Sequence, residues 1–214
     1  RLRCDWSSDV CSSDLKFTAF MLGAVGIAGF LAVAPVSAQQ NVTDEMLRTA
    51  QEDPNNWLMA TGNYTGNRFS KLGQINTGNV RNLVPKWIFS LGVLDAQNTT
   101  PVIQDGVMYA TASHGRTYAI DASKGTELWR YAHQLPEGVA GKMCCDIGNR
   151  GVALYGDKVF VATPDAHVVA LNKTTGEVVW DVTIGEWENA YTMTVAPLVV
   201  KGNVIVGMSG AEYP

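Results

Sequence analysis

Two stretches of the chain share one pattern: YAIDASKGTELW (118–129) and VALNKTTGEVVW (169–180). They align with an offset of 51 residues, and the segments before them, GVMYAT and DKVFVA, also match. Each stretch carries an alanine, an aspartate or asparagine, a glycine and a tryptophan at the same positions (Ala119, Asp121, Gly125, Trp129; Ala170, Asn172, Gly176, Trp180). A repeat of this length, with about four strands per unit, is typical of a β-propeller blade.

The chemistry of the repeated residues explains the pattern. The aspartate or asparagine side chain can bond the backbone two residues further on, which turns the chain into the next strand. The glycine supplies the positive φ of that turn. The tryptophan can wedge between neighbouring blades, with its indole N–H bonded to a backbone carbonyl. The alternative is two unrelated hairpins with matching turns. A single blade cannot bury both of its faces, so repeated blades need neighbours.

Short apolar runs fill much of the remaining chain, and their β-branched and aromatic residues indicate strands. The runs are KWIFSLG (86–92), VMYATA (107–112), RTYAID (116–121), ELWRY (127–131), VALYG (152–156), KVFVAT (158–163), HVVALN (167–172), EVVWDV (177–182), APLVVKG (196–202) and NVIVGM (203–208). A third unit begins at residue 196, and Trp87 can close an earlier one. We therefore predict an all-β fold, consisting of the first four-stranded blades of a propeller that is cut at Pro214.

One short helix is expected before the blades, over TDEMLRTAQEDPNNW (43–57). Thr43 can cap its first turn, Asp44 and Glu45 suit its positive end, and Pro54 stops it.

The first residues need separate treatment. Residues 1–15 contain DWSSDVCSSDL, which resembles a translated sequencing adapter, and we interpret them as an artefact rather than a polar tail. Residues 16–38 have a cation, an apolar run and a small-residue end, the order of a cleaved secretory signal. A membrane helix is the alternative, but the run is short for one. Residues 39–214 are then the mature propeller part, exported to the periplasm.

Composition excludes one class of partner. The 214 residues carry a formal net charge of −4, with Lys+Arg 16 and Asp+Glu 20. No basic run stands out, so nucleic acid is not an expected partner.

The adjacent cysteines Cys144 and Cys145 lie in MCCDIGNRG (143–151). The chain has four cysteines, and the other two fall within residues 1–15. Neighbouring Cα atoms lie about 3.8 Å apart, whereas ordinary disulfides need roughly 4.4–6.8 Å. A bond between neighbours would therefore be strained, and such strain marks functional sites. Two free, buried thiols are the alternative. A zinc site is not expected, because the histidines lack ligand spacing.

These motifs resemble the pyrroloquinoline quinone (PQQ) dependent alcohol dehydrogenases, exported eight-bladed propellers of the methanol and ethanol dehydrogenase type. The resemblance covers essentially all of residues 39–214. It rests on the two tryptophan repeats and on WLMATGNYTGNRFSKLGQINTGNVRNL (57–83), CCDIGNRGVALYGDKVF (144–160), YTMTVAPLVVKG (191–202) and SGAEY (209–213). The Cys-Cys-Asp-x-x-Asn-Arg-Gly motif is highly specific, whereas non-catalytic propellers share the repeat.

The resemblance implies a set of cofactor residues. Cys144 and Cys145 would form a ring disulfide against one face of PQQ, and Arg150 would reach the quinone oxygens. Thr194 would bond a cofactor carboxylate. The edge of the cofactor would be lined by Ser209, Gly210 and Ala211.

Two acidic positions of the family differ in how they match this chain. Glu212 matches the family's carboxylate ligand for a Ca²⁺ or lanthanide ion beside PQQ. Asn98, in QNTTP (97–101), stands where methanol dehydrogenases have a glutamate, so its cofactor contact is in doubt.

The resemblance also implies an activity: oxidation of a primary alcohol to the aldehyde. An aspartate base takes the alcohol proton, hydride passes to the quinone, and electrons leave to a c-type cytochrome. The base would lie beyond residue 214, so the chain alone is expected to be inactive. The full-length protein can be a homodimer. The alternative is a non-catalytic propeller that serves as an envelope assembly scaffold.

Overall fold

The computed structural model describes residues 39–95, 97–143 and 146–210. The expectations for residues 1–15 and 16–38 therefore lie outside the described residues. Within the described ranges, no helix is long and apolar enough to cross a membrane.

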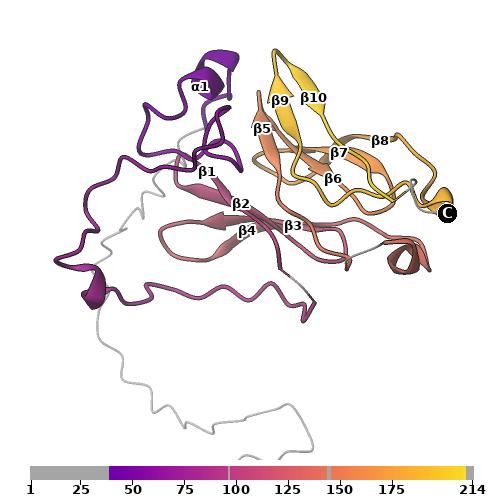
Figure 1. Ribbon diagram of the computed structural model, residues 1–214, viewed down its shortest axis with the longest axis horizontal. Coiled ribbons are helices and arrows are strands. Elements are labelled where there is room, and N and C mark those ends of the chain that lie inside the picture. Colours follow the sequence, from indigo (N-terminus) through magenta and orange to yellow (C-terminus); the bar gives the residue numbers. More distant parts are fainter. Residues whose placement is uncertain (1–38, 96, 144–145, 211–214) are drawn as a thin grey trace, which may run out of the picture. The chain divides into compact units, whose positions relative to one another are not determined.

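The structure contains two four-stranded antiparallel sheets (Figure 1). The first sheet has the order β1-β2-β3-β4, and the second has the order β5-β6-β7-β8. Their strands are β1 (Val102–Gln104), β2 (Val107–Ala112), β3 (Arg116–Asp121), β4 (Glu127–Ala132), β5 (Ala153–Tyr155), β6 (Lys158–Ala162), β7 (His167–Asn172) and β8 (Val178–Thr183). A hairpin of β9 (Leu198–Val200) and β10 (Asn203–Ile205) follows. The predicted blade organisation is confirmed, because each repeat unit is one sheet.

Helical segments are short. The α-helix α1 (Asp44–Arg48) and the 3-10 turn η1 (Val80–Asn82) precede the sheets. The 3-10 turns η2 (Val139–Lys142) and η3 (Trp187–Asn189) follow β4 and β8. The helix begins as predicted, with the Thr43 side chain accepting from the N–H of Met46. The prediction that it continues to a stop at Pro54 is wrong. It ends at Arg48, and the Thr49 hydroxyl donates to the Glu45 carbonyl at 2.8 Å in the last turn.

The strand predicted over residues 86–92 is not formed. This segment pairs with no strand among the residues that the structure describes, and Ile88 is 87% exposed. Its tryptophan nevertheless docks as expected, because the Trp87 indole N–H donates to the carbonyl of Ala122 at 3.0 Å. A short apolar run becomes a strand only where a neighbouring strand supplies the hydrogen bonds of its backbone.

The two sheets repeat the same row of residues across their strands. In the first sheet, the register aligns Val102, Tyr109, Ala119 and Trp129. In the second sheet, the same register aligns Ala153, Phe160, Ala170 and Trp180. The alanine in each row therefore lies between two aromatic residues, whose ring centroids are 5.9 and 5.7 Å apart in the two sheets. This packing explains why the repeat carries a small residue there.

The repeated turns also form as predicted. The Asp121 carboxylate accepts the backbone N–H groups of Ser123 and Lys124, at 2.9 and 3.1 Å. The Asn172 side chain has the same role in the second sheet, bonding residues 174 and 175. Gly125 and Gly176 have φ of +72° and +75°. Each glycine lies against the tryptophan that docks on its turn, Trp87 on Gly125 and Trp129 on Gly176.

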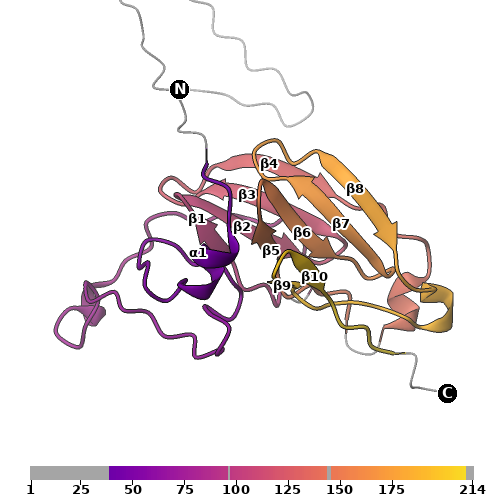
Figure 2. The same ribbon diagram turned by 90° about the horizontal axis from the view of Figure 1, so that it is seen from above.

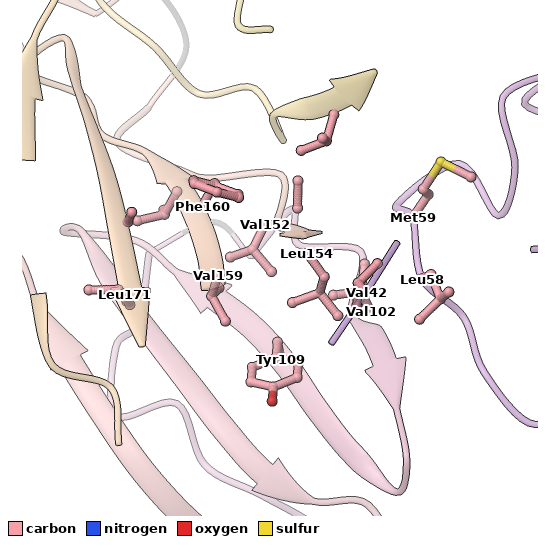
Figure 3. Close-up of a cluster of buried hydrophobic side chains, with 14 of the residues drawn as sticks. Val42, Leu58, Met59, Val102, Tyr109, Val152, Leu154, Val159, Phe160 and Leu171 are labelled. Carbon is pink, nitrogen blue, oxygen red and sulfur yellow. The ribbon is translucent and has the colours of Figure 1, made fainter. Parts of the chain in front are cut away.

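The two sheets, which Figure 2 shows from above, are joined by a shared hydrophobic cluster (Figure 3). Its buried members include Tyr109 and Val102 of the first sheet and Leu154, Val159 and Leu171 of the second. Trp129 belongs to the same cluster and donates its indole N–H to the Lys173 carbonyl of the second sheet at 3.0 Å. The tryptophan thus fixes one sheet to the next, as the repeat predicted.

Candidate functional site

The segments that enter β1, β5 and β9 are bonded to one another in series. The N–H of Thr100, before β1, donates to the carbonyl of Arg150 at 3.0 Å. The N–H of Arg150, before β5, donates in turn to the carbonyl of Thr194 at 2.9 Å, which lies before β9. Arg150 is therefore held between the first sheet and the final hairpin by its own backbone.

Asn149 fixes the backbone that carries Arg150. It is buried, with 3% of its surface exposed, and its side-chain amide donates to the Ala162 carbonyl at 2.7 Å. Its side-chain oxygen accepts the N–H of Gly151 at 2.9 Å. Gly151 has φ +129°, and a Cβ there would lie 2.8 Å from the Thr100 carbonyl oxygen. Asn and Gly in the Asn-Arg-Gly motif are thus structural supports for the arginine.

The Arg150 side chain is held by Thr194. Its Nη1 donates to the Thr194 hydroxyl and, at 3.4 Å, to the Thr194 carbonyl. No carboxylate among the described residues forms an ion pair with Arg150, and the residue is exposed. The other nitrogens of the guanidinium remain available for an anionic or carbonyl ligand.

A cavity of about 370 Å³ opens beside this arginine. Four of the residues named from sequence line it: Asn98, Arg150, Thr194 and Ser209. The other lining residues are Met143, Asp146, Gly148, Thr192, Val195, Gly207 and Met208. The volume lies within the range of roughly 300–1,000 Å³ that is usual for small-molecule sites. Sequence positions as distant as Asn98 and Ser209 therefore meet at one cavity.

Backbone bonds hold the far wall of the cavity. Thr192 and Ser209 exchange N–H···O bonds of 3.0 Å in both directions, and the Thr192 hydroxyl also donates to the Ser209 carbonyl. Gly210 follows as a buried residue with φ +103°. Asn149 and Thr192 stand in the sequence motifs, but their positioning roles were not predicted, because their hydrogen bonds reach other segments of the chain.

Four predicted site residues cannot be placed. Cys144, Cys145, Ala211 and Glu212 lie outside the described residues, and so does any bond between the cysteines. Met143 and Asp146, which flank the cysteine pair in sequence, both line the cavity.

A second, larger cavity of about 550 Å³ adjoins the first and shares Asn98, Arg150 and Val195 with it. Its other walls are mainly apolar and come from the segment around Leu58 and from β5 and β9. The smaller cavity is the better candidate, since the guanidinium and hydroxyl groups converge there.

Docked four-stranded blades define a β-propeller, and a cavity lined by a guanidinium, a carboxylate and hydroxyl groups lies at their inner strands. The family model described as the glucose/ethanol/alcohol dehydrogenase β-propeller domain, a PQQ family, matches residues 57–213. The chain belongs to this family.

Characterised relatives agree. The chain is 41% identical over 197 residues to the quinoprotein alcohol dehydrogenase PedH of Pseudomonas putida, covering 91% of this chain and 32% of that protein. It is 41% identical over 203 residues to a quinone-linked 1-butanol dehydrogenase of Thauera butanivorans, covering 91% and 32%. The chain thus spans about a third of the length of the curated relatives that it matches.

Solved structures show the same architecture. A quinohemoprotein alcohol dehydrogenase of Pseudomonas putida superposes with a TM-score of 0.78 and 38% identity, over 81% of this chain and 26% of the other. A europium-containing methanol dehydrogenase gives a TM-score of 0.75 at 34% identity, over 79% and 30%.

Proposed function

We propose that this chain is the part of a PQQ-dependent alcohol dehydrogenase that holds the reactive edge of the quinone. The observation that carries the proposal is the Arg150 guanidinium, fixed by Thr194 at the cavity and lacking a carboxylate partner among the described residues. When bound, PQQ accepts the hydride that a primary alcohol loses on oxidation to the aldehyde.

The residues of the cavity fit such a group. PQQ is a planar quinone whose carboxylates make it an anion, and the cavity offers a guanidinium and the hydroxyls of Thr194 and Ser209. A fixed cation is suited to stabilise negative charge that develops on the quinone oxygens. The backbone of Arg150 is held by hydrogen bonds, so the guanidinium needs little reorganisation when a ligand binds. This convergence favours a ligand site over a non-catalytic scaffold.

Contacts from the residues outside the described ranges complete the proposal. We assign Cys144 and Cys145 to one face of the quinone, because their neighbours Met143 and Asp146 line the cavity. We assign Glu212 as an oxygen ligand of a Ca²⁺ or lanthanide ion, because it follows Ser209 and Gly210 closely and hard cations prefer carboxylates. Asn98 lies at the same cavity as a neutral contact.

The cellular setting is proposed from the sequence. An exported chain with a cleaved signal over residues 16–38 would work in the periplasm and pass electrons to a c-type cytochrome. The catalytic aspartate and the remaining metal ligands belong to parts of the enzyme that this chain does not include. The 214-residue chain is therefore expected to bind the cofactor more weakly than the full-length enzyme, and to show no turnover.

A binding experiment tests the proposal. PQQ is titrated into the full-length protein, with metal present, while tryptophan fluorescence is recorded. Arg150→Gln should weaken binding at least about tenfold, since hydrogen bonds to charged groups are worth about 1.5–3 kcal/mol. Arg116→Gln is the matched control, because this arginine bonds the Gly92 carbonyl away from the cavity. Equal effects of the two substitutions, or no binding of PQQ by the wild-type protein, would refute the proposal.

A further inference from the structure

Two histidines and an aspartate meet at the boundary between the two four-stranded sheets. His133 follows β4 of the first sheet, Asp165 lies in the turn between β6 and β7, and His167 begins β7. One ligand atom from each residue lies within 4.8 Å of the other two. The side chains of His133 and Asp165 are 8% and 3% exposed, and that of His167 is 27% exposed.

The three atoms that converge are two imidazole nitrogens and one carboxylate oxygen. His133 Nε2 lies 2.9 Å from Asp165 Oδ2, and His167 Nε2 lies 3.9 Å from the same oxygen. The Asp165 carboxylate is therefore buried between two imidazoles.

The other ring nitrogen of each histidine and the other carboxylate oxygen of Asp165 form hydrogen bonds outside the cluster. The Nδ1 of His133 bonds the Tyr131 hydroxyl at 2.9 Å, and the Nδ1 of His167 bonds Asp181 Oδ1 at 2.7 Å. Asp165 Oδ1 accepts from the Thr163 hydroxyl at 2.5 Å. Histidines that ligate metals usually donate their other N–H to a carboxylate or another acceptor, which fixes the ring and the tautomer. His167 has this arrangement with Asp181, and the Nδ1 of His133 faces a hydroxyl that can accept its N–H once Nε2 binds a cation.

Two hydroxyl groups can serve this tautomer. The Tyr131 hydroxyl can donate to His133 Nδ1 while Nε2–H bonds Asp165, and it can accept from Nδ1–H when Nε2 binds a cation. The Thr183 hydroxyl lies 3.1 Å from His167 Nε2 and can donate to it, which leaves Nδ1 as the protonated nitrogen. A bound cation would replace this weak donor at the more exposed side of the cluster.

We propose that His133, Asp165 and His167 bind a transition-metal dication of the Zn²⁺ type. Two imidazole nitrogens and one carboxylate oxygen are a common ligand set for Zn²⁺, with a fourth position left for water. Ca²⁺ and Mg²⁺ prefer all-oxygen sites and would not compete. His133 belongs to one sheet and the other ligands to the next, so the ion would link consecutive blades. None of these residues lines the Arg150 cavity, and the site requires no PQQ.

The test is a calorimetric titration of Zn²⁺ into metal-stripped full-length protein without PQQ. We expect saturable binding of one ion and a rise in the melting temperature with excess Zn²⁺. His167→Asn should abolish this binding. His114→Asn is the matched control, because the third histidine pairs with Asp95, away from the cluster, and this variant should bind Zn²⁺ like the wild type.

A substitution outside the ligand set separates a positioned site from casual binding. Asp181→Asn keeps all three ligands but weakens the acceptor for His167 Nδ1, and it should weaken Zn²⁺ binding by about 10–100-fold. Circular dichroism confirms that each variant folds. Zn²⁺ binding that is unchanged in His167→Asn, as cysteine ligands would give, overturns the proposal, and so does no binding by the wild type. Neither result bears on PQQ binding.

Discussion

The two four-stranded sheets have the same register, the same turns and the same aromatic row, yet their tryptophans lie in different surroundings. Trp129 is 9% exposed, packs on Gly176 and donates its indole N–H to the Lys173 carbonyl. Trp180 is only partly buried, and no described residue accepts its N–H. Its ring centroid lies 5.7 Å from that of Phe160, within its own sheet. The docked tryptophan is thus held by the turn of the following sheet.

The turn that receives Trp129 shows the same dependence. Lys173 offers its carbonyl to Trp129, and it also accepts from the Tyr109 hydroxyl at 3.3 Å. Its ammonium group is buried and donates to the Gln40 carbonyl and the Gln104 side chain, both at 2.7 Å. In the first sheet, Ala122 occupies the equivalent position and receives Trp87 with no such side chain. The backbone carbonyl is the constant element of docking, and the side chain around it varies.

The largest difference between the two sheets is expected when each tryptophan is replaced by alanine. Trp129→Ala should lower the free energy of unfolding by about 3–5 kcal/mol, as expected for a large buried side chain. Trp180→Ala should cost less than half as much, because its ring is less buried and its N–H has no acceptor among the described residues. Urea denaturation followed by circular dichroism measures both. Equal losses would mean that docking on the next sheet adds nothing.

The turn on which Trp129 docks can be tested separately. Gly176→Ala puts a Cβ 2.7 Å from the Trp129 ring at a φ of +75°. We expect a loss of about 2–3 kcal/mol from backbone strain and overpacking together. Gly156→Ala is the control for strain alone, because its φ is +59° and nothing lies within 4 Å of the added atom. It should cost about 1–2 kcal/mol, and a Gly176 variant no worse than this would exclude the ring contact.

The two sheets also differ in the asparagines of the loops that precede β1 and β5. Asn98 and Asn149 are 51 residues apart, the offset of the repeat. Asn98 is exposed at the cavity, whereas Asn149 is buried and bonds the Ala162 carbonyl and the Gly151 N–H. Asn149→Ala should cost about 1–3 kcal/mol of folding stability, because it leaves buried groups unpaired. Asn98→Ala should stay within about 0.5 kcal/mol. Thermal unfolding of the two variants distinguishes them.

The smallest expected difference concerns the turns and depends on pH. The bond from the Ser123 hydroxyl, with those from Lys124 and the backbone, lowers the pKa of Asp121 to about 2. A lowered pKa in the folded state stabilises the protein above the unfolded value of about 3.9. That contribution is lost as the pH falls from there toward 2.

The second sheet has Asn172 at this position, which does not titrate. Asp121→Asn should therefore reduce the loss of stability between about pH 4 and pH 2 relative to the wild type. Melting temperatures measured across this range test it. An unchanged slope would show that the charge on Asp121 does not support its turn.

Much of the fold could be predicted from local residues. The docking tryptophans, the turn glycines and the Asp or Asn side chains act over a few residues, so their pattern was readable and the sheets confirmed it. The errors came where a segment depends on distant partners. Residues 86–92 formed no strand, because apolar composition alone does not provide a neighbouring strand to pair with. The helix that begins at Asp44 ended already at Arg48.

The candidate site was only partly readable. The resemblance led to Arg150, Thr194, Asn98 and Ser209, and the structure brings these four to one cavity. The supporting role of Asn149 was missed, because its bonds to Ala162 and Gly151 depend on how β6 lies beside the loop.

By itself, the sequence determined the blade repeat and its docking residues, because turn conformation and aromatic packing follow from short-range chemistry. Tertiary structure alone decided which groups meet across blades. The histidines at 133 and 167 have no ligand spacing in sequence, yet pairing of β6 with β7 and packing of the sheets bring both to Asp165. Only the packed sheets also distinguish Trp129 from Trp180, since a docking site consists of another blade's backbone.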